Sequence, residues 1–183
     1  MNAIIKQRTA IFAKVLDRLP EIRYVGDPIL RTPTEIATIK EASDIAKKLH
    51  NTLREYQKIT RTGRGLAAPQ IGIARSVFIT YVNNKLCVYI NPNIVRISRE
   101  TNLYRELCLS SGLMSADVRR PERVAMEWYN VSGQRHEKVF TSFEARLVQH
   151  EYDHLLGIPN LDKAEHGSIE FVIRDPLTEQ LRK

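Results

Sequence analysis

Two pairs of segments with alternating apolar and polar residues constrain what this chain can fold into. The segments SVFITYV (76–82) and KLCVYI (85–90) flank Asn83 and Asn84, which tolerate the left-handed backbone of a two-residue hairpin turn. The segments RVAMEWYN (123–130) and QRHEKVF (134–140) flank Ser132 and Gly133 in a similar way. Strands arranged in hairpins are therefore expected from about residue 76 to residue 140.

A helix is predicted on each side of this strand-rich region. Upstream, Ser43 is the expected N-cap of a helix with one core-facing stripe. That stripe consists of Ile45, Leu49, Leu53, Tyr56 and Ile59. Downstream, Thr141 and Glu144 fit a capping box at a helix start, and Gly157 and Pro159 end that helix. Without an internal repeat or a linker, these elements predict one α+β domain.

The N-terminus is interpreted separately from that domain. Residues 1–20 have apolar residues at helical spacing, several basic residues and no acid before Asp17, whereas residues 21–183 form the single domain. The first segment fits either an ordinary amphipathic helix or an organellar transit segment. The ordinary helix is favoured, because transit segments are usually richer in serine and arginine.

Composition excludes several classes of protein. The 183 residues are 43% hydrophobic and 27% charged, which is ordinary for a chain with a packed core. No window approaches the ~18 consecutive apolar residues of a membrane span, so no membrane partner is expected. Two cysteines, Cys87 and Cys108, fit a reducing compartment. The net charge of +7 favours an anionic partner such as the ribosome, but the basic residues are too scattered to predict direct readout of nucleic acid.

The downstream helix carries the stretch QHEYDHLLGI (149–158), which is a candidate metal site. Phe143, Leu147, His150 and His154 fall within one narrow stripe of the helix. Two histidines four residues apart can converge on one metal ion, and Glu151 could then take a proton from a water that the metal activates.

Asp153 lies on the other flank of this helix, near Arg146 one heptad earlier. It is expected either to support the metal site or to form a surface ion pair.

The residues alone do not identify the third metal ligand beside His150 and His154. The longer zinc-peptidase pattern would require a third histidine where Asn160 stands, so that class lacks a ligand. Glu170 could serve in another peptidase layout, and Cys108 in YRELCLSSG could supply a thiolate. Cys108 could equally be a small buried apolar residue, as Cys87 is expected to be.

Three ordered motifs resemble those of the peptide deformylases. They are GRGLAAPQIG (63–72), ELCLS (106–110) and QHEYDHLLG (149–157), and the resemblance extends through VGDPILR, INPNI, VRRPERV and NLD. It implies removal of the formyl group from the N-terminal formyl-methionine of nascent proteins, by a fold of antiparallel sheets packed around a central metal-binding helix. It also implies the bacterial cytoplasm, or alternatively a mitochondrion or plastid.

The resemblance implies roles for individual residues. The metal ligands fall on Cys108, His150 and His154, with Fe2+ as the expected ion and Zn2+, Ni2+ or Co2+ as substitutes. Glu151 would act as general base and then as general acid. The side-chain amide of Gln70 and the backbone N–H of Leu109 would hold the oxyanion. The implied substrate-binding residues are Gly63, Arg64, Gly65, Glu106, Leu107 and Leu147, with an apolar pocket beside the motif helix for the methionine side chain.

The chain departs from the family pattern at a few positions. Leu107 stands where glycine is usual and would be strained if its backbone needed a positive φ. Ser111 and Gly112 replace an apolar residue and proline. Arg64 stands at a usually apolar position, where it is expected to lie over the substrate groove or to pair with a carboxylate such as Glu106. In the groove it would favour an acidic residue after the formyl-methionine.

Two alternatives stay open. One is a catalytically divergent deformylase-like protein, and the other is a His-Glu-x-x-His metallopeptidase. The segment from residue 166 to residue 183 also lacks the long basic helix by which some bacterial relatives contact the ribosome.

Overall fold

Two antiparallel sheets and three α-helices make up the fold in a computed structural model, which describes residues 3–171. The helices are α1 (Ala3–Arg18), α2 (Ile39–Thr60) and α3 (Ser142–Leu155). The strands are β1 (Gly65–Ala67), β2 (Val77–Val82), β3 (Lys85–Ile97), β4 (Thr101–Leu107), β5 (Met114–Pro121), β6 (Arg123–Tyr129), β7 (Arg135–Thr141) and β8 (Glu170–Phe171). Short 3-10 helices are η1 (Pro28–Arg31), η2 (Ala68–Ile71), η3 (Leu109–Ser111) and η4 (Asn160–Lys163). The α+β class is confirmed.

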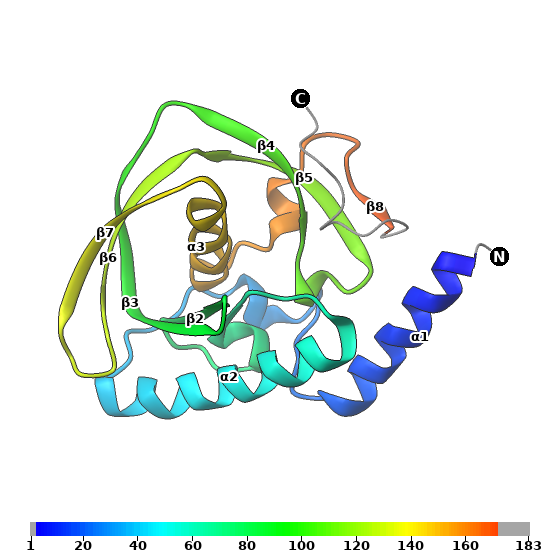
Figure 1. The fold of residues 1–183 in the computed structure, drawn as a ribbon, viewed down its shortest axis with the longest axis horizontal. Coiled ribbons are helices and arrows are strands. Elements are labelled where there is room, and N and C mark those ends of the chain that lie inside the picture. Colours follow the sequence, from blue (N-terminus) through cyan, green and yellow to red (C-terminus); the bar gives the residue numbers. More distant parts are fainter. Residues whose placement is uncertain (1–2, 172–183) are drawn as a thin grey trace.

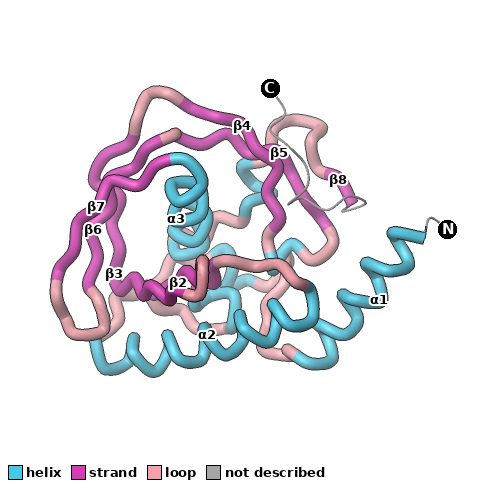
Figure 2. The backbone as a smooth tube through the Cα atoms, in the orientation of Figure 1, coloured by secondary structure: helices cyan, strands magenta, loops and turns pink. Residues whose placement is uncertain are grey.

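The sheets enclose the motif helix. One sheet has the strand order β1-β2-β3-β6-β7 and the other has the order β4-β5-β8. Figure 1 shows α3 in the middle of a frame of strands, with α2 crossing below it. The tube in Figure 2 shows β3 beside β6, with β7 following on the other side of β6. Apolar side chains of α3, such as Val148 and Leu155, are buried with Phe78 and Met126 of the larger sheet, so burial of apolar area fixes the helix in this frame.

Both predicted hairpins are present. Val82 pairs with Lys85 across a turn whose Asn83 and Asn84 have φ of 51° and 60°. This is the left-handed backbone that a two-residue turn requires. The second hairpin joins β6 to β7, and Gly133 in its turn has φ of 75°.

The long helix α2 begins earlier than predicted. Its N-cap is Thr38, whose hydroxyl accepts a hydrogen bond from the backbone N–H of Glu41 at 3.3 Å. The prediction of Ser43 as N-cap is wrong, because Ser43 lies inside the helix and donates its hydroxyl to the Ile39 carbonyl at 3.0 Å. Thr38 and the glutamate three residues later, Glu41, match the local sequence pattern of a helix start.

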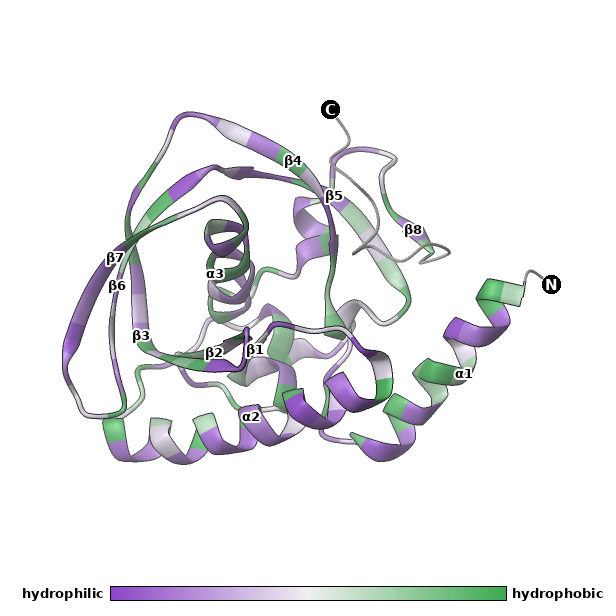
Figure 3. Cartoon of the chain, in the orientation of Figure 1, coloured by the Kyte–Doolittle hydropathy of each residue, from purple (hydrophilic) through white to green (hydrophobic). Residues whose placement is uncertain are grey.

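The apolar face of α2 was predicted correctly. Ile45, Leu49 and Leu53 are buried in a core cluster that also contains Leu66 and Ile79 from the larger sheet. Figure 3 shows green and purple residues alternating along α2, as expected for a helix with one buried face.

Helix α1 is attached to the rest of the chain through its last turns. Val15 is buried with Leu19, Ile22 and Tyr56, whereas the first turns point away from the molecule in Figure 1. The division into residues 1–20 and 21–183 stays a prediction. None of the described helices is long and apolar enough to cross a membrane.

Candidate metal centre and active site

Three side chains from two separate segments meet in the interior. Cys108 follows β4 directly, and His150 and His154 stand one turn apart on α3. One ligand atom from each of the three lies within 4.8 Å of the others. The Cys108 Sγ and the His154 Nε2 are 3.2 Å apart, and both residues are only 1% exposed.

This arrangement fits a metal ion. Ligand bonds of about 2.3 Å to sulfur and about 2.0 to 2.1 Å to nitrogen place two ligands of one tetrahedral ion about 3.3 to 3.6 Å apart. A thiolate with two imidazoles is a donor set that suits Fe2+ and Zn2+. The Glu151 Oε2 beside these ligands is also buried without a hydrogen-bond partner in the described part of the chain, which is unusual unless a bound group completes the site.

Burial and charge act in opposite directions on these groups. Burial raises the pKa of the Cys108 thiol, but His154 and His150 hold it well below its ordinary value. Burial lowers the pKa of His150, yet Cys108 and then Glu106 raise it well above its ordinary value. The thiolate form that a metal needs is therefore favoured at position 108.

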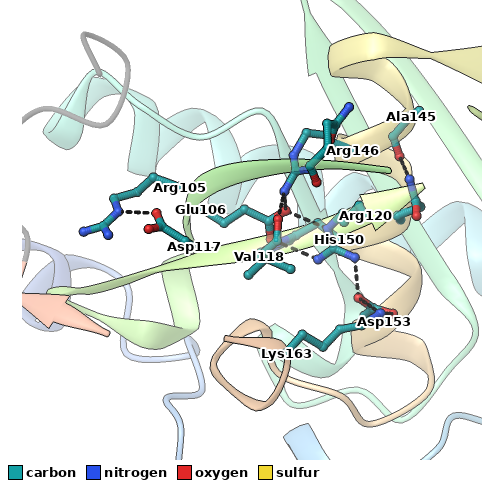
Figure 4. Close-up of polar contacts among 12 residues, drawn as sticks. Arg105, Glu106, Asp117, Val118, Arg120, Ala145, Arg146, His150, Asp153 and Lys163 are labelled. Carbon is teal, nitrogen blue, oxygen red and sulfur yellow. Dashed lines mark hydrogen bonds and ion pairs between the residues drawn. The ribbon is translucent and has the colours of Figure 1, made fainter. Parts of the chain in front are cut away.

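His150 is oriented by a carboxylate behind it. Its Nδ1 lies 2.9 Å from Glu106 Oε2, which leaves Nε2 free for a metal. Figure 4 shows Glu106 between His150 and two guanidinium groups. Arg120 donates to both oxygens of Glu106, at 2.6 and 2.9 Å, and Arg146 donates to Oε1 at 2.7 Å.

Further ion pairs connect these residues to Asp153 of α3. Arg120 also donates to Asp153 at 2.6 Å, and Lys163 of η4 donates to the same carboxylate at 2.9 Å. Burial opposes ionisation of Glu106, but Arg120 keeps the pKa of Glu106 far below its usual range. The ligand helix is thus joined to β4, β5 and η4 by alternating charges, of which Lys163 is exposed and the others are buried or half-buried (Figure 4).

These contacts distinguish between the two alternatives expected for Asp153. Asp153 is 6% exposed and supports the site by pairing with Arg120 and Lys163, whereas Arg146 pairs with Glu106. Asp153 therefore does not form the surface ion pair that was the alternative. No sequence pattern predicted this role for Arg120, which was noted only as part of the segment VRRPERV.

Gln70 is fixed with its amide N–H groups toward Cys108. Its Oε1 accepts a hydrogen bond from the Ala67 backbone N–H at 2.8 Å, so the Nε2 must point the other way. That Nε2 donates to Ser110 Oγ at 3.1 Å and lies 3.5 Å from Cys108 Sγ. Leu109, whose backbone N–H is the second proposed donor, opens η3 directly after Cys108.

Glu151 lies against a glycine. A Cβ at Gly65 would come within 2.3 Å of Glu151 Oε1, so β1 must have a glycine at this position. Burial raises the pKa of Glu151 to about 7. A carboxyl group with a pKa near neutrality can both accept and release a proton at physiological pH.

A cavity of about 430 Å³ opens onto these groups. Its lining includes all six predicted substrate-binding residues, which are Gly63, Arg64, Gly65, Glu106, Leu107 and Leu147. Tyr104, Phe143 and Arg146 also line it and were not named as substrate-binding residues. The Arg146 guanidinium lies 4.7 Å from the centre of the Tyr104 ring, so this charged group lies in the cavity wall beside the apolar side chains of Phe143 and Leu147.

Leu107 is not strained. It is paired with Ser115 at the end of β4 and is absent from the residues with positive φ among those described. The left-handed backbone occurs instead at Gly112, with φ of 62°.

The capping box expected at the start of α3 is absent, and Arg64 takes only one of its two expected positions. Thr141 caps α3 without a side-chain hydrogen bond, since Ser142 has φ of 53° and Glu144 pairs with Lys138 instead. Of the two positions expected for Arg64, the structure has the one over the groove: Arg64 lines the cavity and lies over the Phe143 ring at 5.2 Å, whereas Glu106 is occupied by Arg120 and Arg146.

The alternative that Glu170 supplies the third ligand is wrong. Glu170 pairs with Arg105 rather than with the cluster of Cys108, His150 and His154. The C-terminal expectation concerns mainly residues 172–183, which lie outside the described residues.

Comparisons with known proteins agree with this geometry. Residues 19–169 match the family model described as polypeptide deformylase. A peptide deformylase from Pseudothermotoga lettingae is 37% identical over 163 residues, which cover 89% of this chain and 92% of that protein.

Solved structures agree as well. The crystal structure of a peptide deformylase from Thermotoga maritima matches with a TM-score of 0.70 and 33% identity, over 79% of this chain and 96% of that one. A Plasmodium falciparum peptide deformylase structure matches with a TM-score of 0.73 and 30% identity, over 80% and 86% of the two chains.

Proposed function

The chain belongs to the peptide deformylase family, and from this premise we propose how its own residues remove the formyl group from formyl-methionyl peptides. The enzyme is a metal-dependent amide hydrolase, and neither the metallopeptidase nor the catalytically divergent alternative is favoured. The observation that carries the proposal is one cavity onto which His150, Glu151 and Gln70 open beside Cys108.

Cys108, His150 and His154 would hold the metal. When bound there, the ion lowers the pKa of a water molecule and polarises the formyl carbonyl. Glu106 keeps the His150 ring in the orientation that leaves Nε2 available, and its own charge strengthens that nitrogen as a ligand.

Glu151 moves the proton. Its pKa of about 7 lets the carboxylate take a proton from the attacking water and then give it to the departing amine. Gly65 leaves room for the carboxylate against the strand, which supports this role because proton transfer requires the group to lie within hydrogen-bond reach of the water.

Gln70 and Leu109 would stabilise the oxyanion. The fixed amide of Gln70 aims its N–H groups toward Cys108, and the Leu109 N–H lies one residue beyond that ligand. Loss of one such donor typically lowers kcat by ~10²- to 10³-fold.

The substrate would lie along β1. Gly63, Arg64 and Gly65 would offer backbone groups to an extended peptide, which then adds to the strand edge. The methionine side chain would enter the cavity beside Leu147 and Phe143 of α3.

The identity of the metal, the partner and the compartment are further parts of the proposal. Fe2+ is proposed as the native ion, with Zn2+, Ni2+ or Co2+ as substitutes, because the sulfur and nitrogen donors suit all four. Ribosome contact is supported only by the net charge of +7. The bacterial relative supports the bacterial cytoplasm as the compartment, with the mitochondrion or plastid as the alternative.

Formate release tests the function. The protein, purified without oxygen and analysed for metal, should release one formate per formyl-Met-Ala-Ser consumed. The control substrate is Met-Ala-Ser, which should be left intact. Release of free amino acids without formate would contradict the proposal and would indicate a peptidase.

A further inference from the structure

The direction in which a bound peptide leaves the active site follows from β1. Glu151 lies against Gly65, and Gln70 follows just after the strand. Beyond Gly65, Leu66 and Ala67 are 0% exposed, so no peptide can continue that way. A chain extended along β1 must therefore run past Gly63 and Thr62.

A second hollow lies at this exit. It measures about 320 Å³ and shares Thr62, Gly63 and Arg64 with the active-site cavity. Its other walls come from the end of α2 and from the β2–β3 turn. They include Arg54, Gln57, Arg61, Tyr81, Val82, Asn83 and Asn84.

The hollow has positive charges and no carboxylate. Arg54, Arg61 and Arg64 line it, and its lining contains no aspartate or glutamate. Arg54 lies 4.9 Å from the centre of the Tyr81 ring, and Arg64 lies 5.2 Å from that of Phe143. The rings orient these guanidinium groups but leave their charge in place.

Several exposed arginines of the described chain have acidic partners, although Arg96 and Arg99 do not. Examples are Arg18 with Glu55, Arg31 with Asp162, Arg119 with Glu165 and Arg123 with Glu100. No such ion pair within residues 3–171 involves the three arginines of the hollow. An anion that reached this place would meet guanidinium groups without first displacing an internal carboxylate.

We propose that this hollow is a subsite for acidic side chains of the substrate, downstream of the formyl-methionine. This inference rests on the proposed function. From Gly65 to Thr62 an extended chain spans about 10 Å at roughly 3.3 Å per residue, so the third and fourth residues of a substrate reach the arginines. Nascent chains with acidic residues at these positions are then the preferred substrates.

The expected preference is modest because the arginines are exposed. An exposed charge pair changes a rate constant by about 1.5- to fivefold. Two pairs together therefore raise kcat/KM for an acidic peptide about two- to 25-fold over a neutral one. Screening should reduce the preference as the Debye length falls from about 10 Å at 0.1 M salt to about 3 Å at 1 M.

The test compares formyl-Met-Ala-Glu-Glu, formyl-Met-Ala-Gln-Gln and formyl-Met-Ala-Lys-Lys by formate release. In the wild type, kcat/KM should fall in that order at low salt. In the double variant Arg54→Gln/Arg61→Gln, the ratio of the Glu to the Gln peptide should fall toward one. The matched control is Arg96→Gln/Arg99→Gln, which removes one exposed arginine near the end of β3 and one in the β3–β4 connection and should keep the wild-type ratio.

The outcomes separate this inference from the proposed function. Absence of formate from the Gln peptide contradicts the proposed function itself. Normal turnover with equal kcat/KM for the three peptides overturns only the subsite. If both double variants reduce the ratio equally, net charge is responsible and the subsite is wrong. A Glu-to-Gln ratio unchanged by Arg54→Gln/Arg61→Gln, with weaker binding of a labelled oligouridylate, would instead make the hollow an RNA contact.

Discussion

Arg120→Leu should destabilise the protein strongly, because this guanidinium is the central charge of the buried network. Arg120 is 1% exposed and makes hydrogen bonds of 2.6 and 2.9 Å to Glu106 and of 2.6 Å to Asp153. Removing one partner of a buried ion pair typically costs ~3 to 5 kcal/mol, since the other charge remains buried. Arg146 and Lys163 still neutralise the two carboxylates, so a cost beyond this range is not expected.

The free energy of unfolding can be measured by urea denaturation, with the fluorescence of the single tryptophan, Trp128, as the signal. Metal content must be equal in all samples, because a bound ion stabilises the folded state. A loss of ~3 to 5 kcal/mol corresponds to a fall in Tm of roughly 6 to 20 °C. If Arg120→Leu does not fold, Arg120→Lys retains the charge with fewer hydrogen bonds and should lie between it and the wild type.

The neighbouring arginine is the control. Arg119 pairs with Glu165 at the surface, where the two side chains are 52% and 42% exposed, so Arg119→Leu should cost at most ~1 kcal/mol. Equal stability of the two leucine variants would refute the reasoning, because the burial of Arg120 would then have no energetic consequence.

The free energy of unfolding at low pH provides a further check on the Arg120–Glu106 ion pair. The pKa of Glu106 is lowered in the folded state, so its contribution is fully present above the unfolded value of about 4.3 and is lost as the pH falls. Arg120→Leu should move the folded pKa of Glu106 back toward that value. The variant should therefore lose less stability than the wild type between about pH 4 and pH 2.

Other substitutions test the active site. Cys108→Ala should release the metal, because a tetrahedral site loses charge and geometry without its thiolate, whereas Cys87→Ala should retain it; metal analysis distinguishes them. Glu151→Gln should bind the metal fully and lose turnover, since the carboxylate moves protons and is no ligand; full formate release would mean that another group is the base. Gly65→Ala should lower kcat at full metal content, because its Cβ would come 2.3 Å from Glu151; an unchanged kcat would contradict the proposed position of the carboxylate.

Much of the fold follows from local patterns in the sequence. The Asn83–Asn84 turn can form only with a left-handed backbone, and asparagine tolerates it, so the first hairpin is specified by residues that are neighbours along the chain. Helical spacing likewise predicts the buried face of α2. The start of that helix was misjudged because two capping signals, at Thr38 and Ser43, compete within five residues.

The sequence by itself determined which groups can do chemistry: a thiol, two histidines four residues apart and the glutamate between them. These depend on residue type and helical spacing, which are local properties. Only the tertiary structure decided that Arg120 joins Glu106 to Asp153 and that Arg64 lies over Phe143. Glu106, Arg120 and Asp153 come from β4, β5 and α3. Their contacts depend on strand register and on how the sheet closes around the helix, and no pattern of neighbouring residues encodes that.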